Sequence, residues 1–411
     1  MMLDALRLAF ITTLLLGGAS LERLDDAFGE LGVFGEVRFA GMLLVATALT
    51  LFMAAPRRPP LSGPLFAWLL LLAALHAEVA ASWLWSDRTP YAKAQLLEVG
   101  FSAAALALAV PLVRDAPERC LRLFLVVLYG SAVAFVLVSL VLSGAPAGEL
   151  AGAGAGGIGG ARLLCMGVLA AAWLMREGGR HAWLLLVPVP LMLAGAVVSG
   201  SRAAVLALLI ALGVSWLHWR SDRDGSTTAG SHSRRGMSAL LAVGLLAAVT
   251  VPFTRAIGQI WLEQLLASSS AAGGIYLADR DVIFADAWQQ FSIHPLGGIG
   301  IGSYIGPFGE QYPHNLLLSF AIDAGAFALA GAFLGITAGF AVLVGQRSTA
   351  AGAALAGASF FAVVSFFAGS YYDARFLWVF LLFGFGLRAP LGGRIGVLHL
   401  ARAPDAEEVP A

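Results

Sequence analysis

The segment from residue 255 to residue 315 carries the side chains best suited to chemistry. Arg280 is followed directly by Asp281, and at the end of the segment His314 is followed by Asn315. A guanidinium group attracts phosphate, and an imidazole with its ordinary pKa near 6.5 accepts a proton at neutral pH. General-base assistance of this kind is worth about 100-fold to 10,000-fold in rate. These residues predict an active site that combines phosphate binding with general-base catalysis.

A second candidate for phosphate binding is Arg202, which follows Ser199, Gly200 and Ser201 at the start of an apolar segment. The distribution of basic residues described below places this turn outside the cytoplasm, where membrane proteins carry few arginines. Arg202 is therefore either an anchor at the membrane surface or a contact for an anion, which the first amides of the helix would also attract. Two such arginines could each contribute on the order of 4 kcal/mol of attraction to a phosphate at about 4 Å and an effective dielectric near 20, before desolvation.

Arg280 begins a pattern in which Phe284 and Trp288 follow at intervals of four residues. This spacing places the three side chains on one face of a helix, and Asp279 is a plausible N-cap. The alternative is an amphipathic helix on the membrane surface, in which Arg280 pairs only with Asp281 or lipid head groups.

Two glycine-rich stretches have different contexts. Gly154, Gly156 and Gly159 match a dinucleotide-binding pattern, but no strand precedes them, which favours a flexible connector. The run from Gly297 to Gly302 follows the predicted turn at His294, for which we expect a structural role. Its glycines permit either close approach to a ligand or a tight return to the membrane.

Composition indicates an all-α integral membrane protein. Of the 411 residues, 59% are hydrophobic and 12% are charged, which is too little polar surface for a soluble globule. The apolar runs lack the two-residue alternation of barrel strands and therefore predict helices. Cys120 and Cys165 suggest neither a disulfide nor a metal site, because one lies in a predicted cytoplasmic loop and the other inside a predicted span.

A helix needs roughly 20 apolar residues to cross the hydrocarbon core. The sequence predicts about twelve transmembrane helices, at 4–20, 38–55, 65–85, 92–113, 121–143, 161–176, 182–198, 202–219, 237–253, 316–345, 350–369 and 375–388. The span at 316–345 is longer than needed and contains Gly325, so it is either tilted or begins as a short helix outside the membrane. The predicted organisation is nine helices within 1–254, a large periplasmic loop with short helices and the active site at 255–315, three helices within 316–390, and a cytoplasmic tail at 391–411.

Arginines recur on every second loop and assign that side to the cytoplasm. Examples are Arg57 and Arg58, Arg119 and Arg122, Arg234 and Arg235, and Arg394. Both termini are therefore predicted to be cytoplasmic, with the 255–315 loop outside.

Ionisable residues inside predicted spans are costly and usually face the interior of the bundle. They are His76, Glu78, Glu98 and Asp323. A proton path formed by these groups would fit a transporter, which is a different class of function from an enzyme.

Several short motifs lie between about residues 195 and 330: Ser199 to Arg202, Arg280 with Trp288, His294 to Gly298, Gly300, His314 with Asn315, and Asp323 to Gly325. Together they resemble the O-antigen ligase and polymerase superfamily of bacterial membrane glycosyltransferases. The first 190 residues agree with that superfamily only in having many spans.

The resemblance implies a glycosyltransferase-C-like fold in the bacterial inner membrane and a metal-independent, cofactor-free transfer on the periplasmic face. The donor would be a glycan on undecaprenyl diphosphate and the acceptor the lipid A core, in lipopolysaccharide biosynthesis, without nucleic acid. By position, Arg202 and Arg280 would hold the diphosphate and His314 would activate the acceptor hydroxyl. Secondary candidates are Arg375, Asp281, Asn315 and Ser201. A ligase is favoured over an O-antigen polymerase or a protein O-oligosaccharyltransferase, and a flippase or transporter of lipid-linked saccharides is the alternative of another class.

Overall fold

The computed structural model describes residues 61–142, 157–177, 182–198, 201–223, 280–369 and 371–388, and within these ranges its regular secondary structure is entirely helical. The helices are α4 (Gly63–Ala81), η1 (Ser82–Trp85), α5 (Pro90–Asp115), α6 (Pro117–Leu142), α8 (Gly157–Glu177), η2 (Ala182–Leu186), α9 (Val189–Val198), α10 (Arg202–Arg223), α13 (Arg280–Ile293), α14 (Leu316–Ala324), α15 (Ala326–Val344), α16 (Thr349–Ala368) and α17 (Tyr371–Leu387).

Seven helices in these ranges are long and apolar enough to cross a membrane, which makes the chain a multi-pass membrane protein. They correspond to the spans predicted at 65–85, 92–113, 121–143, 161–176, 202–219 and 350–369, and to the second part of 316–345. The segment predicted at 182–198 is instead a short 3-10 turn followed by the ten-residue α9. The last predicted span corresponds to the 17-residue α17. The spans predicted at 4–20, 38–55 and 237–253 lie outside the described residues.

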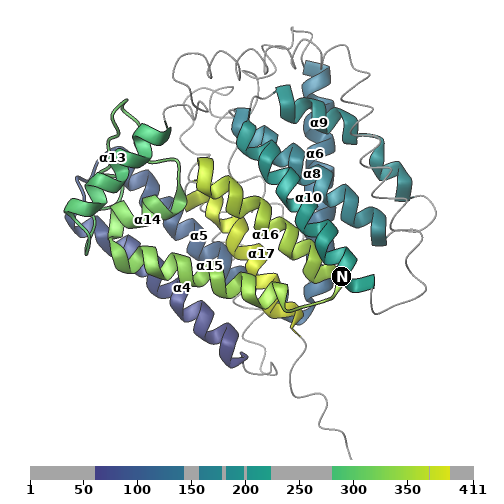
Figure 1. The fold of residues 1–411 in the computed structure, drawn as a ribbon, viewed down its shortest axis with the longest axis horizontal. Coiled ribbons are helices and arrows are strands. Elements are labelled where there is room, and N and C mark those ends of the chain that lie inside the picture. The colour runs from purple at the N-terminus through teal and green to yellow at the C-terminus, as the bar shows by residue number, and fades with distance from the viewer. Residues whose placement is uncertain are drawn as a thin grey trace, which may run out of the picture.

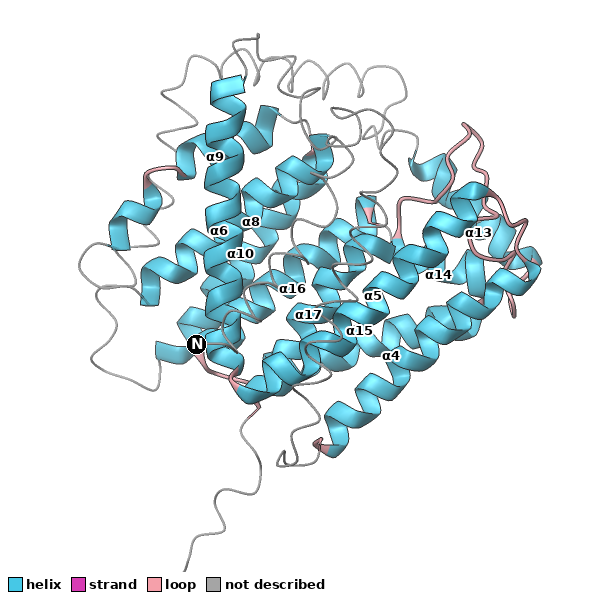
Figure 2. Cartoon of the chain, turned by 180° about the vertical axis from the view of Figure 1, so that it is seen from behind, coloured by secondary structure: helices cyan, strands magenta, loops and turns pink. Residues whose placement is uncertain are grey.

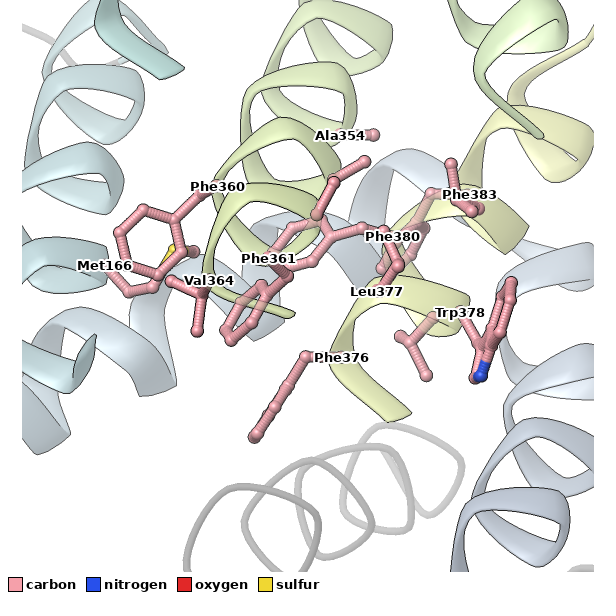
Figure 3. Close-up of a cluster of buried hydrophobic side chains, with 14 of the residues drawn as sticks. Met166, Ala354, Phe360, Phe361, Val364, Phe376, Leu377, Trp378, Phe380 and Phe383 are labelled. Carbon is pink, nitrogen blue, oxygen red and sulfur yellow. The ribbon is translucent and has the colours of Figure 1, made fainter. Parts of the chain in front are cut away.

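Helices α16 and α17 form the centre of the bundle (Figures 1 and 2). α16 packs against α10, and α17 packs against α5 and α15. Their shared core is rich in aromatic rings (Figure 3): Phe361 stacks on Phe376 with centroids 4.8 Å apart, and Phe380 meets Phe124 of α6 edge to face at 5.2 Å. Offset and edge-to-face pairs of this kind add to the stability that burial alone provides.

Contacts near the helix ends establish the direction of each helix. Trp173 and Trp219, both close to the C-terminal ends of α8 and α10, have ring centroids 5.1 Å apart. These two helices therefore run in the same direction. His218 at the end of α10 bonds to the carbonyl of Ser348 at the start of α16 (3.1 Å), and Gln346 after α15 donates to Gly384 near the end of α17 (2.6 Å). α16 therefore runs antiparallel to α10, so that α17, which follows α16, begins near the start of α10. α15 runs parallel to α17, so α14, which precedes α15, lies at the same end. We call the end of the bundle with the starts of α8, α10 and α17 and with α14 the site end.

The long apolar segment predicted at 316–345 is broken into two helices. Gly325 separates α14 from α15 with φ 90° and ψ −166°, a conformation that belongs almost only to glycine. This confirms that the segment begins with a short helix. Asn315 starts α14 as its N-cap, because its side-chain oxygen accepts a hydrogen bond from the Leu318 amide at 3.1 Å.

Candidate active site

Helix α13 covers the site end through one apolar face. Ile283 and Ala287 are buried and pack with Tyr304 and Ile322. The predicted stripe was one position away from this face: Phe284 is only partly buried, and Trp288 is 55% exposed. Arg280, in the first turn, is therefore positioned by the burial of Ile283 and Ala287.

The glycine-rich run that follows α13 approaches the backbone of the protein itself. The amides of Ile299 and Gly300 donate to the carbonyls of Ile322 and Asp323, at 2.7 and 3.1 Å. A side chain at Gly298, whose φ is +65°, would lie 2.2 Å from the Ile322 oxygen. The close approach that Gly298 permits is thus to the end of α14 of the same chain, and a ligand contact of the run stays a prediction.

A second set of hydrogen bonds ties the same run to the turn after α4. Trp85 Nε1 donates to the Gly297 carbonyl at 3.0 Å, and Ser86 Oγ donates to the Ile301 carbonyl at 2.7 Å. The Ile301 amide in turn donates to Ser82 Oγ at 3.0 Å. The loop between α13 and α14 is therefore fixed on two sides, as a precise catalytic arrangement requires.

His314 has a strained backbone. Its φ is +53°, a left-handed conformation that costs a residue with a side chain about 1–2 kcal/mol. The imidazole lies 4.2 Å from the Tyr312 ring, centroid to centroid, and its Nδ1 atom is buried without a hydrogen-bond partner in the described structure. Strain of this kind persists where the surrounding structure imposes it and is concentrated at functional sites. This geometry sets His314 apart from His294, which is exposed.

The electrostatic environment favours the neutral form of His314. Burial lowers the pKa of the imidazole, the nearby charge of Arg280 lowers it further, and Glu310 opposes the shift. Burial also lowers the pKa of the Arg280 guanidinium, and Tyr312 partly offsets this change. Arg280 and His314 are thus close enough to influence one another. A neutral imidazole beside a guanidinium can accept a proton while the guanidinium binds an anion.

The structure adds three residues that sequence reasoning had not singled out. Arg162 of α8 forms an ion pair with Asp373 of α17, with 2.7 Å between Nη1 and Oδ1. Burial is the largest cause that raises the pKa of the Tyr312 hydroxyl, and the charge of Asp373 raises it further. The charges of Arg162 and Arg280 lower this pKa. The sequence signal that could have identified Arg162 and Asp373 was their charge near the starts of two apolar helices, where a charged residue is costly.

Arg202 begins α10, as predicted, and Ser201 before it is buried. The parallel α8 and α10 place Arg202 at the same end of the bundle as Arg162. Arg202 is thus at the site end. Its part in phosphate binding stays a prediction.

The secondary candidates have different surroundings. Asp281 is exposed in the first turn of α13, and the Asn315 side chain caps α14. Only 3% of Arg375 is exposed, and its guanidinium lies over the rings of Phe376 and Phe101, at 4.2 and 5.7 Å. This placement favours a packing role for Arg375.

Two of the ionisable groups that suggested a proton path have close partners. Asp323 accepts a hydrogen bond from the Tyr371 hydroxyl at 2.8 Å. His76 bonds to the Leu72 carbonyl at 2.7 Å and lies 3.4 Å from Ser102 Oγ. The contact between Tyr371 and Asp323 joins α17 to α14, and that between His76 and Ser102 joins α4 to α5, whereas the bond from His76 to Leu72 lies within α4.

Comparison with known proteins gives a match to a family model. Residues 187–333 match the family model described as O-antigen ligase. The matched stretch runs from just before α9 into α15 and contains Arg202, Arg280 and His314, whereas Arg162 and Asp373 lie outside it. No curated protein matches the chain.

Proposed function

We propose that this chain, whose residues 187–333 match the O-antigen ligase family model, transfers a glycan from undecaprenyl diphosphate to a hydroxyl of the lipid A core. The family implies glycan transfer of the O-antigen ligase or polymerase type and lipid-linked glycan substrates. The reaction would take place at the site end of the bundle, which we assign to the periplasmic face of the inner membrane.

The observation that carries the proposal is the proximity of Arg280 and His314. The arginine lies at the start of α13 and the histidine just before α14, and the charge of the first lowers the pKa of the second. A bare anion site would not need an imidazole kept neutral and held in a strained conformation. A general base would need both features, because it must be unprotonated and correctly oriented before the acceptor arrives.

In the proposed reaction, the acceptor hydroxyl gives its proton to the neutral imidazole of His314 as its oxygen attacks the anomeric carbon of the donor sugar. The bond from that carbon to the phosphate oxygen breaks, and its electron pair leaves with the diphosphate. Arg280 stabilises the charge that develops on the leaving group. We assign Arg202 to the same diphosphate. Two guanidinium groups can supply this stabilisation in place of a metal ion. Attack opposite the leaving group inverts the anomeric centre, which NMR of the product linkage tests.

The main experiment compares His314→Ala with the matched variant His294→Ala in vesicles supplied with lipid-linked glycan and lipid A core. His294 belongs to the same connection between α13 and α14 but is exposed. We expect His314→Ala to bind donor and to lose transfer by about 100-fold to 10,000-fold, and His294→Ala to retain both. Full transfer by His314→Ala would exclude the general-base role.

The acceptor decides between the two superfamily activities. A ligase attaches the glycan to lipid A core, whereas a polymerase attaches it to a second lipid-linked glycan. Supplying the two acceptors separately to the wild-type protein distinguishes them. Movement of intact donor between leaflets without transfer would instead favour a flippase.

A further inference from the structure

The ion pair between Arg162 and Asp373 lies in a sheltered position at the site end. Relative exposures of the two side chains are 11% and 22%, and the charged atoms are 2.7 Å apart. Removing two charges from water is costly, so burying an ion pair adds little net stability to packed helices. By contrast, the ion pair between Arg122 and Glu177 has side chains 64% and 33% exposed and a 3.7 Å separation.

The first turn of α17 connects this ion pair to the candidate active site. Tyr371 of that turn donates to Asp323 of α14 at 2.8 Å, and its ring lies 5.0 Å from Phe320. Two residues later, Asp373 reaches α8. Because α14 starts directly after His314, the same turn of α17 contacts both the helix that follows the histidine and the helix that carries Arg162.

Arg162 and Arg280 lie close enough to interact. The charge of Arg162 lowers the pKa of Arg280, and both arginines lower the pKa of the Tyr312 hydroxyl. Asp373 pairs with Arg162, whereas no carboxylate in the described part of the chain forms an ion pair with Arg280. Two guanidinium groups whose charges both act on one tyrosine can each contact one phosphate of a diphosphate.

We propose that Arg162 is a further cation of the donor diphosphate site and that Asp373 is its internal counter-ion, which phosphate oxygens displace when the donor binds. This inference rests on the proposed function for the identity of the anion. Asp373 would hold Arg162 in place while the site is empty, so that the guanidinium is not left unpaired in a sheltered environment. The cost of this arrangement is competition between the Asp373 carboxylate and the diphosphate.

This competition predicts opposite effects from the two halves of the ion pair. Arg162→Gln removes a phosphate contact, and we expect the Kd for diphosphate to rise about tenfold or more. Asp373→Asn removes the competing charge, and we expect the Kd to fall severalfold. In the double variant, Asp373→Asn should no longer matter, and the Kd should equal that of Arg162→Gln.

The experiment measures binding of undecaprenyl diphosphate to the full-length protein in phosphatidylcholine nanodiscs, without acceptor. Undecaprenyl monophosphate is the second probe, and we expect Arg162→Gln to weaken its binding less than that of the diphosphate. Arg122→Gln is the control, because it removes an arginine from a different interhelical ion pair of α8 and should leave both Kd values unchanged. If Arg162→Gln does not fold, Arg162→Lys and Asp373→Asn decide the question: Lys should weaken diphosphate binding partially, and Asn should strengthen it.

Two results would overturn this inference. One is an unchanged Kd in Arg162→Gln, and the other is weaker binding in Asp373→Asn with a lower melting temperature, as expected for a purely structural ion pair. Binding measurements on these variants test the role of Arg162 and Asp373, whereas transfer by the wild type tests the proposed function. Wild-type transfer with no effect of either variant on binding would refute only the role of Arg162 and Asp373. Opposite effects on binding without any wild-type transfer would refute only the glycosyltransferase.

Discussion

The strained backbone of His314 leads to a prediction that separates folding from catalysis. At its φ of +53°, alanine has the same side-chain clash as histidine, about 1–2 kcal/mol, whereas glycine avoids it. Glycine also gives the unfolded chain more conformational entropy, which lowers stability by about 0.4–1 kcal/mol. The difference makes His314→Gly more stable than His314→Ala by about 0.8 kcal/mol at the midpoints of these ranges and by at most about 1.6 kcal/mol. Both variants lose the imidazole, so both should lose transfer by about 100-fold to 10,000-fold.

The assay measures the free energy of unfolding in mixed micelles by titration with a denaturing detergent, alongside transfer in vesicles. His294 is the matched control, because its backbone is not among the described positions with positive φ. There the order should reverse, with glycine less stable than alanine by about 0.5–1 kcal/mol. If alanine is at least as stable as glycine at position 314, the strain argument is refuted. If either His314 variant transfers at close to the wild-type rate, the base assignment is refuted.

Three further predictions concern neighbouring groups. Arg280→Gln should weaken donor binding about 10-fold to 150-fold, because it removes a charge-assisted contact of about 1.5–3 kcal/mol. Arg280→Lys should have an intermediate Kd, because lysine keeps the charge but not the planar guanidinium fork. Equal Kd values in the wild type and both variants would contradict this prediction. Glu310→Gln removes a negative charge that raises the pKa of His314, so the variant should have a lower His314 pKa. Transfer is lost on acidification when His314 becomes protonated, and in Glu310→Gln this loss should occur at lower pH than in the wild type. A shift to higher pH would contradict the assigned electrostatics. Gly325→Ala would bring a methyl group 2.1 Å from a backbone oxygen, whereas Gly309→Ala, at nearly the same φ (+89° against +90°), would meet nothing within 4 Å. The first should therefore cost about 1–3 kcal/mol more in unfolding free energy, and equal stability would show that the loop can move away from α14.

The amino-acid sequence by itself determined the class of fold and the residues at the centre of the candidate site. Long apolar runs without alternation allow only membrane helices, because backbone groups in hydrocarbon must be satisfied within the segment. The break near Gly325 and the start of α10 at Arg202 could also be anticipated, since both depend on local signals. His314 and Arg280 stood out because charge and imidazole are rare in such a chain.

Other features depend on tertiary contacts that a linear pattern does not contain. The buried face of α13 is set by Ile283 and Ala287 packing on Tyr304, a contact that helical spacing alone placed one position away. The glycine run packs against the end of α14, and this contact depends on where that helix ends in space.

The ion pair between Arg162 and Asp373 is the clearest case of a feature decided by the tertiary structure. These residues are more than 200 positions apart in the chain and are brought within 2.7 Å only by the packing of α8 and α17 into one bundle. The strength of an electrostatic interaction depends on the distance between the charges and on their burial, and the amino-acid sequence does not give either quantity directly. Sequence therefore identified which groups could do chemistry, whereas the fold decided which of them act on one another.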